Sequence, residues 1–335
     1  MITTSVYRDI ADVPADEWDL VVERAGAPVF YRHAYLSAQA RTAVMPAQAQ
    51  VLVIARDSSG DPIAICPASL QAPSDPLGAL ANRVHGYDPH DRALLSHNWQ
   101  CYDTRLPATE HRAPLRIVQT LREVAVEAGA SWLGFVNVTA GPQLAALADA
   151  GFDVVEMDER FCLDLRDIHT IEDYLQRLRS SARRNMRRYQ RRAQERGVVV
   201  ENLAVRDVDL DEAVTLIRDT AARHGAADFY RDGPFQDFLH SLGDLVTTIR
   251  ISDADRLLAV GFCLPDRDRF HLWTCGAVYQ YDAAFSPYTL LFLEMVRSAV
   301  ASGRPLLEGG RRNREYKERH GLHRVPLHAA MVRLG

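Results

Sequence analysis

The order of strand and helix patterns is the feature that most constrains this 335-residue chain, because that order recurs in its two halves. In the first half, two apolar runs flank a polar turn at residues 57–61 and predict a β-hairpin. In the second half, residues 245–277 predict a meander of three strands. Helix, strand, helix and strand patterns follow in each half. The order predicts a two-domain α/β (α+β) protein whose halves meet near residues 165–170.

Composition limits the class of protein. Hydrophobic residues make up 47% of the chain, enough for a sizeable core, and the net charge of -5 excludes an overall basic field. The five cysteines include no CxxC pair, which argues against a disulfide framework or a zinc knuckle. HExxH spacing is absent too, so we expect no metal. Because neither a signal peptide nor an apolar run of about 20 residues is present, we expect a cytoplasmic protein without membrane insertion.

Lys317 is the only lysine among the 39 basic residues. A coding bias toward arginine would replace lysine wherever any cation serves. A lysine that remains can mark a place that needs a compact ammonium group and cannot accept a planar guanidinium. Chance survival of one lysine is the alternative.

The sequence predicts one helix over residues 171–196, and its arginine-rich part, residues 177–196, holds nine arginines. Apolar residues recur along it every three or four positions, so one face of the predicted helix packs on the protein. Arginines four residues apart repel each other, which favours bound anions, and phosphate matches the guanidinium fork. A solvated face balanced by acidic residues elsewhere is the alternative.

A second segment, residues 307–321, combines a strand end, a glycine turn and a short helix. The strand reaches Glu308, two glycines turn the chain, and the helix carries Tyr316 and Lys317. Glycines allow a ligand to approach the backbone closely, and ligands often bind at the carboxyl ends of strands. A surface helix with a solvated lysine is the alternative.

In this order, the two segments resemble the Fem-type transferases and Fem-like proteins of the GNAT superfamily. The run from Ser181 to Arg187 is similar to the family's K-T-R-x-N-I-R motif and matches it at Arg183, Asn185 and Arg187. It departs from the motif at Ser181 and Ala182. The family's glycine turn followed by Tyr-Lys resembles Gly310, Tyr316, Lys317 and Gly321.

The resemblance implies two tandem GNAT-like domains, each a mixed, mostly antiparallel sheet flanked by helices. Residues 1–166 would form the acceptor side, and residues 167–335 the donor side with the arginine-rich helix and Lys317. The implied activity is amide-forming transfer of an aminoacyl group from aminoacyl-tRNA to an amine. The acceptor would be a small molecule or peptide precursor in natural-product or cell-wall-like biosynthesis.

The donor can be narrowed by one departure from ordinary GNAT enzymes. Those enzymes hold the pyrophosphate of CoA on a glycine-containing turn at a helix start. The corresponding stretch, residues 279–289, contains no glycine. Aminoacyl-tRNA is therefore the favoured co-substrate, acyl-CoA is the alternative, and no bound cofactor is expected. A non-catalytic RNA-binding module that uses the arginine-rich helix is the second alternative.

The reaction class suggests roles for particular residues, since an amine must attack a carbonyl group through an oxyanion. We expect Lys317 to stabilise charge at the carbonyl or the donor phosphate, Tyr316 to support it, and Glu308 to act as a base or lysine partner. The predicted phosphate-binding residues are Arg183, Arg184, Asn185 and Arg187. The pocket candidates, each with core or loop packing as the alternative, are His271, Trp273 and Tyr279 in the meander and His97, Tyr102 and Asp103 in the first half.

Overall fold

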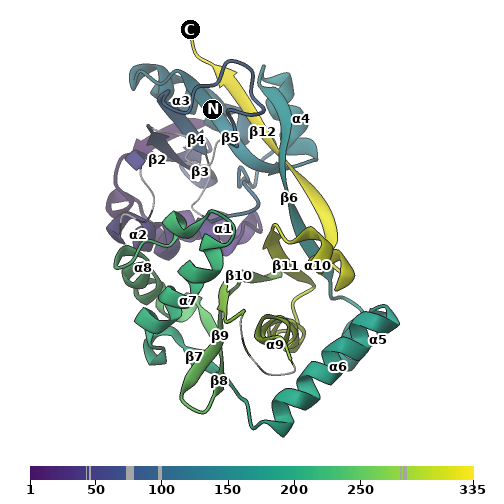
Figure 1. The fold of residues 1–335 in the computed structure, drawn as a ribbon. Helices are drawn as coiled ribbons and strands as arrows, with labels where there is room; N and C mark the ends of the chain where they lie inside the picture. The colour runs from purple at the N-terminus through teal and green to yellow at the C-terminus, as the bar shows by residue number, and fades with distance from the viewer. Residues whose placement is uncertain (43, 45–46, 73–78, 97–99, 280, 282–284) are drawn as a thin grey trace. The chain divides into compact units, whose positions relative to one another are not determined.

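The computed structural model describes residues 1–42, 44, 47–72, 79–96, 100–279, 281 and 285–335 (Figure 1). Its chain contacts form two compact units. Met1–Glu159 and Val325–Gly335 make the first unit, and Arg160–Arg324 make the second. The sequence placed the boundary at 166/167 and the whole C-terminus in the second half, whereas the last strand here belongs to the first unit.

The first unit is a mixed sheet with helices α1 (Ala15–Arg24), α2 (His33–Thr42), α3 (Ala113–Glu127) and α4 (Pro142–Asp149). Its strands are β1 (Thr3–Tyr7), β2 (Ala47–Arg56), β3 (Pro62–Gln71), β4 (Ala93–Ser96), β5 (Trp132–Thr139) and β12 (His323–Arg333), in that spatial order. Neighbouring strands are antiparallel except β4 and β5, which are parallel. Ile117, Leu121 and Val124 are buried, as the helical spacing of α3 predicts.

The second unit repeats this plan. β6 (Asp153–Asp164) enters it at Arg160 and pairs with β11 (Leu306–Arg311), followed in space by β10 (Arg269–Ala277), β9 (Arg256–Pro265), β8 (Thr247–Asp253) and β7 (Val199–Ala204). Its helices are α5 (Ile171–Arg177), α6 (Ser180–Glu195), α7 (Leu210–Ala222), α8 (Pro234–Leu242), α9 (Pro287–Ala301) and α10 (Arg314–Arg319). Short 3₁₀ turns in the two units span Ile10–Asp12, Val29–Tyr31, Val205–Asp207, Ala227–Phe229 and Gly243–Leu245.

The single helix predicted over residues 171–196 is divided into α5 and α6. Thr170 begins α5 with a capping box, in which its hydroxyl accepts from the Asp173 N–H at 3.1 Å and the Asp173 carboxylate accepts from the Thr170 N–H at 2.8 Å. Leu178 ends α5 because its backbone is extended, with φ -73° and ψ 149°. The Leu178 side chain is buried in the core, so packing overrides the helical pattern there.

The core of the second unit lies around α9, which packs on β8, β9 and β10 and against α6 (Figure 1). Ala182, Met186 and Ala193 form the buried face of α6. On β10, Gly276 allows α7 to approach closely, because a Cβ there would lie 2.6 Å from the backbone nitrogen of Ile217. None of the helices in the described ranges combines the length and apolarity needed to cross a membrane.

Candidate functional site

The strands β10 and β11 run side by side only where they begin. Arg269, Phe270 and His271 pair with Leu306, Leu307 and Glu308. Beyond these pairs, and among the described residues, β10 continues to pair only with β9. The later part of β11 pairs only with β6. The carboxyl ends of parallel strands are a common place for ligands, since backbone groups outside a ladder remain available. We therefore place the candidate site at these diverging ends.

The ammonium group of Lys317 is buried at the end of β11. Lys317 is 6% exposed, and its Nζ donates a hydrogen bond of 2.6 Å to the carbonyl oxygen of Arg311. Nζ also lies 5.3 Å from the centre of the Phe161 ring, which is a cation–π distance. Burial raises the pKa of the Cys275 thiol to about 11, and the charge of neighbouring Lys317 opposes that shift. An ammonium group that already donates to a carbonyl oxygen has the chemistry to stabilise an oxyanion. Its part in transfer stays a prediction.

The loop between β11 and α10 is held in an unfavourable backbone conformation. Arg312 and Asn313 have φ values of 62° and 54°, a region that costs a non-glycine residue about 1–3 kcal/mol. The Arg312 guanidinium donates to the carbonyl oxygen of His224 at 2.9 Å, and Asn313 Nδ2 donates to the Tyr288 hydroxyl at 3.4 Å. The Lys317 N–H donates to the Asn313 carbonyl oxygen at 3.0 Å, so the same loop fixes the start of α10.

Tyr316, the predicted supporting donor, is a residue of α10 that packs against α9. Its ring centre lies 5.0 Å from that of Tyr288, 5.4 Å from Phe292 and 4.0 Å from His320. Burial raises the pKa of the Tyr316 phenol well above its usual value and lowers the pKa of the His320 imidazole. The structure thus shows Tyr316 as a packing residue of α10, and its role as a donor stays a prediction.

Glu308, the predicted base or lysine partner, is 1% exposed. Its carboxylate forms a buried ion pair with Arg160 and accepts the Gly310 N–H at 3.1 Å. The thiol of Cys162 donates to the same carboxylate at 3.2 Å. A carboxylate held by a guanidinium and a backbone amide is fixed in place, which suits a structural role within β11.

The meander candidates His271 and Trp273 are both buried. His271 Nε2 lies 2.8 Å from a carboxylate oxygen of Asp266, near the beginning of β10. The Trp273 ring packs 6.1 Å from Phe235 and 6.0 Å from Phe238, two aromatic residues of α8. The structure therefore gives Trp273 a place in the core, the alternative stated for it above.

Tyr279, the third meander candidate, is 48% exposed. The guanidinium of Arg223, which follows α7, lies 4.4 Å from the centre of its ring. Of the three meander candidates, Tyr279 is the one that a ligand can reach.

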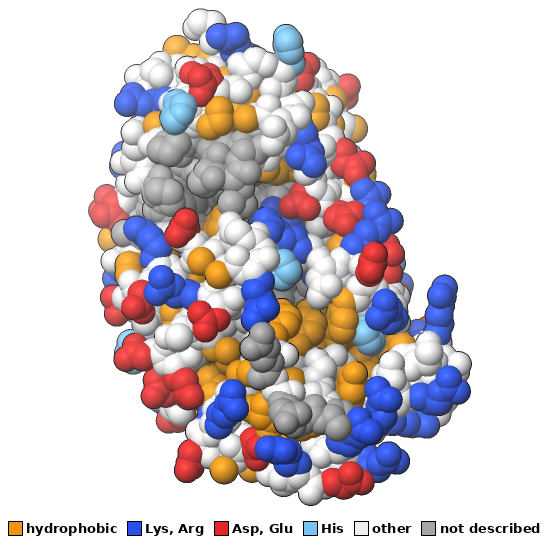
Figure 2. All heavy atoms as spheres, in the orientation of Figure 1, with side chains coloured by type: hydrophobic (Ala, Val, Ile, Leu, Met, Phe, Trp, Pro, Cys, Tyr) orange, Lys and Arg blue, Asp and Glu red, His pale blue; other side chains and the backbone are white. Residues whose placement is uncertain are grey.

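The exposed face of α6 carries the predicted phosphate-binding residues. Figure 2 shows blue side chains gathered where Figure 1 draws this helix. Arginines of the segment that form ion pairs are Arg177, Arg187, Arg191 and Arg196. Arg183 donates to the carbonyl oxygen of Gln176 at 3.2 Å, and Asn185 is exposed. Within the described ranges, Arg184 and Arg188 have no carboxylate within 4.0 Å.

The predicted acceptor-side residues belong to the first unit. His97 lies outside the described residues, and Tyr102 is half-buried. Asp103 is 5% exposed, and its carboxylate accepts from Arg105 Nε at 2.9 Å and from the Thr139 hydroxyl at 3.0 Å. These contacts tie the Asp103 loop to the end of β5, and the part of Asp103 in acceptor binding stays a prediction.

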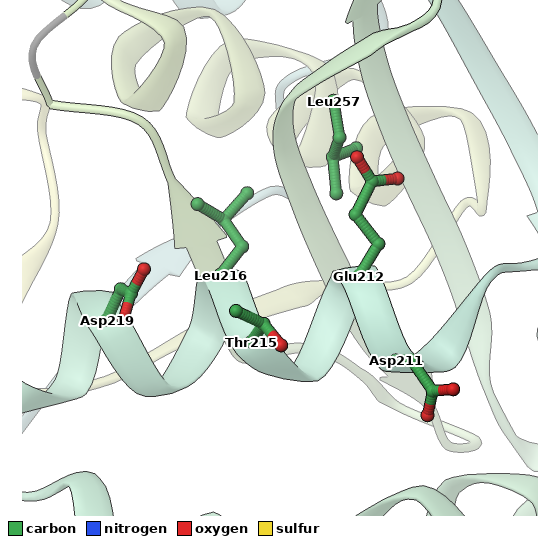
Figure 3. A pocket seen from close by; sticks show the side chains of 6 residues that line it. All are labelled: Asp211, Glu212, Thr215, Leu216, Asp219 and Leu257. Atoms are coloured by element: carbon green, nitrogen blue, oxygen red, sulfur yellow. The ribbon is translucent and has the colours of Figure 1, made fainter.

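A shallow pocket of about 390 Å³ lies elsewhere in the second unit, along α7 and the beginning of β9 (Figure 3). It is lined by Asp211, Glu212, Thr215, Leu216, Asp219 and Leu257. Its carboxylates would favour a cation, but it contains none of the predicted site residues. The described residues include no group of three His, Cys, Asp or Glu side chains that could hold a metal ion.

Sequence reasoning missed Arg160, Asn313 and Tyr288. Tyr288 lies in the stretch 279–289, which drew notice only because it contains no glycine. Asn313 directly precedes the short helix that carries Lys317, and asparagine tolerates the left-handed conformation. Nothing in the local pattern marks Arg160 as the partner of a carboxylate 148 residues away.

Comparison with known proteins gives a match to one domain family over part of the chain and a likeness in fold. Residues 180–318 match the acetyltransferase (GNAT) domain family. No match was found among curated proteins. The chain is similar to solved FemX at 10% identity over 98% of this chain and 97% of that one, with a TM-score of 0.67. A tandem GNAT protein from the clavulanic acid biosynthesis pathway is similar at 12% identity over 99% of this chain and 98% of that one, with a TM-score of 0.57. The C-terminal domain of a putative lysylphosphatidylglycerol synthetase from Agrobacterium fabrum is similar at 14% identity over 93% of this chain and 92% of that one, with a TM-score of 0.59.

Proposed function

Because the chain has a Fem-like tandem GNAT fold and carries an acetyltransferase (GNAT) domain at residues 180–318, we propose that it is an amide-forming acyltransferase. In this proposal the donor is aminoacyl-tRNA, and the acceptor is the amine of a small molecule or peptide precursor. Residues of the second unit hold the donor.

One observation carries the proposal: the only lysine of the chain is buried at the diverging ends of β10 and β11, with its ammonium on a backbone carbonyl oxygen. When an amine attacks an acyl group, negative charge develops on the acyl oxygen. An ammonium group is a compact cation with three N–H donors, which suits it to an oxyanion. Loss of one such donor typically lowers the rate about 100- to 1,000-fold.

The choice of donor rests on charge. α6 presents Arg184 and Arg188 without a carboxylate partner in the described residues, on a helix whose arginine rows repel one another. A polyanion relieves that repulsion, and RNA supplies phosphates at suitable density. The stretch 279–289 has no glycine with which to cradle a CoA pyrophosphate.

Acyl-CoA is the second candidate donor, because the matching family is described as an acetyltransferase domain. In that case Lys317 would serve the same oxyanion, and α6 would not contact the donor. A non-catalytic RNA-binding module is the third candidate, and it predicts binding without turnover.

The test uses purified protein with pooled, aminoacylated tRNA and a panel of small amines and peptides. Formation of an amide product that RNase abolishes supports the proposal. Product that survives RNase and requires added acyl-CoA selects the second candidate, and salt-sensitive RNA binding without product selects the third. Lys317→Met tests the site itself, with Arg319→Met, an exposed cation of the same helix, as the matched control.

A further inference from the structure

The hydroxyl of Tyr288 is a second polar group beside the Lys317 loop. Tyr288 is the second residue of α9 and is half-buried. Its oxygen accepts the Asn313 side-chain N–H at 3.4 Å, and Asn313 is in turn held in a left-handed conformation. Within the described residues, no protein oxygen accepts the hydroxyl hydrogen of Tyr288, which therefore remains available to a ligand.

Tyr288 and Lys317 are linked through residues of the same loop and helix. The Asn313 carbonyl oxygen accepts the Lys317 N–H at 3.0 Å, and the Tyr288 ring centre lies 5.0 Å from that of Tyr316, the residue before Lys317. The Cys275 thiol acts on the pKa of Tyr288 and itself feels the charge of Lys317. Cys275 belongs to the part of β10 that lies beyond its pairing with β11. Asn313 therefore binds both the Tyr288 phenol of α9 and the backbone of Lys317 in α10.

We propose that Tyr288 is a further catalytic residue, which passes a proton from the attacking amine to the leaving oxygen of the donor. The proposal rests on the proposed function, because it requires an oxygen-ester donor. The amine nitrogen bonds to the acyl carbon, and the bond from that carbon to the donor oxygen breaks. The phenol gives its hydrogen to the departing oxygen and takes one from the nitrogen. Tyr288 begins and ends protonated, and an ester and an amine become an amide and an alcohol.

Other candidates for this proton transfer are committed elsewhere. Glu308 is engaged with Arg160, and His271 is buried beside Asp266. Burial raises the pKa of the Tyr288 phenol well above its ordinary value, so the phenol stays protonated at neutral pH. A protonated group is what the leaving oxygen needs, since an alkoxide is a poor leaving group.

The test compares two donors that carry the same aminoacyl group. One is an acceptor-stem RNA microhelix aminoacylated at its 3′ end, and the other is the CoA thioester. Hydroxylamine is the amine, and the rate without protein is subtracted. A thiolate leaves without protonation, so we expect Tyr288→Phe to lower kcat about 100-fold on the ester and less than about fivefold on the thioester. Tyr230→Phe, which removes another phenol of the second unit, is the matched control.

Asn313→Gly provides a second variant, because glycine keeps the left-handed backbone and removes only the amide that orients the phenol. We expect an intermediate loss on the ester. Equal losses on both donors in Tyr288→Phe, or none on the ester, would overturn the role of Tyr288 while the proposed function stands. A parent protein that uses only the thioester, or neither donor, would overturn the proposed donor and this inference with it.

Discussion

The two units share an element order but differ in the polar groups at corresponding strand ends. In the first unit β4 and β5 pair in parallel over Ala93–Ser96 and Trp132–Phe135, as β10 and β11 do in the second. Each unit then has an asparagine with positive φ, Asn137 in β5 and Asn313 after β11. Asn137 donates to the backbone of Cys101 at 3.3 Å, whereas Asn313 donates to a phenol.

The groups near the ends of these two parallel strand pairs thus differ. The first unit has groups there that bind one another: the Ser96 hydroxyl donates to the Pro67 carbonyl oxygen at 3.1 Å, and Asp103 is held by Arg105. The second unit places an ammonium and an available phenol hydrogen there. The comparison teaches that the fold provides the strand ends, while a few side chains decide whether they can carry chemistry.

Glycine substitutions test whether the strands of the two units are packed equally tightly. A Cβ at Gly276 would meet α7 backbone atoms at 2.6 Å, whereas a Cβ at Gly134 of β5 would meet the flexible side chain of Met331. Backbone cannot move aside cheaply, so we expect Gly276→Ala to lower the free energy of unfolding by about 3 kcal/mol and Gly134→Ala by about 1 kcal/mol. Urea denaturation measures both. Equal losses would show that close helix packing is no special requirement of the second unit.

Lys317→Arg tests whether the candidate site of the second unit requires an ammonium group. A guanidinium is larger and planar, and the site beside Phe161 and Arg311 is buried. We expect kcat to fall about 100-fold, and the melting temperature measured beside it reports the separate cost of fitting the larger group. Arg319→Lys, the reverse exchange on the exposed side of α10, should keep parental kcat. Near-parental turnover by Lys317→Arg would contradict the ammonium requirement.

Paired charge removals compare the two units as RNA-binding surfaces. Replacing Arg184 and Arg188 by glutamine removes two cations without carboxylate partners in the described part of α6. We expect RNA affinity to fall about tenfold and the slope of log K against log salt to decrease by about 1.5. Arg8→Gln with Arg112→Gln, an exposed pair in the first unit, is the control. A similar effect of both pairs would mean that the binding is not localised on α6.

Much of the fold was predictable because periodicity reports which face of each element is buried. The tandem, mostly antiparallel fold class is confirmed by the comparisons. The exchange of residues 325–333 into the first unit was not predictable, because a strand pattern specifies a buried face and not a partner. The division of α5 from α6 was missed because Leu178 fits the helical spacing of apolar residues. Tertiary packing nevertheless holds the Leu178 backbone in an extended conformation.

The candidate site was predictable where composition singled out a residue. Lys317 stands out by being the only lysine, and Tyr316 and Glu308 were named as its neighbours in sequence. The structure gives these two residues contacts that the sequence did not predict: Glu308 is held by Arg160, and Tyr316 packs on α9. Their roles in transfer stay predictions. Tyr288, 29 residues before Lys317, looks like any tyrosine at a helix start, because its significance depends on the three-dimensional position of Asn313.

The smallest expected effect concerns His320, which directly follows the last residue of α10. Burial lowers its pKa, and its Nδ1 lies 2.7 Å from the Tyr316 carbonyl oxygen, to which the neutral ring donates. In the unfolded chain the imidazole takes up its proton near pH 6.5, so below that pH the unfolded state binds more protons than the folded one. The free energy of unfolding should therefore decrease as pH falls from 7 to 5. His320→Gln should reduce that decrease by about 1 kcal/mol or less, measured by urea titrations at each pH, whereas His328→Gln in the first unit should retain it. An unchanged slope in His320→Gln would show that the protein tolerates a charged imidazole against Tyr316, and that the end of α10 is looser than its contacts indicate.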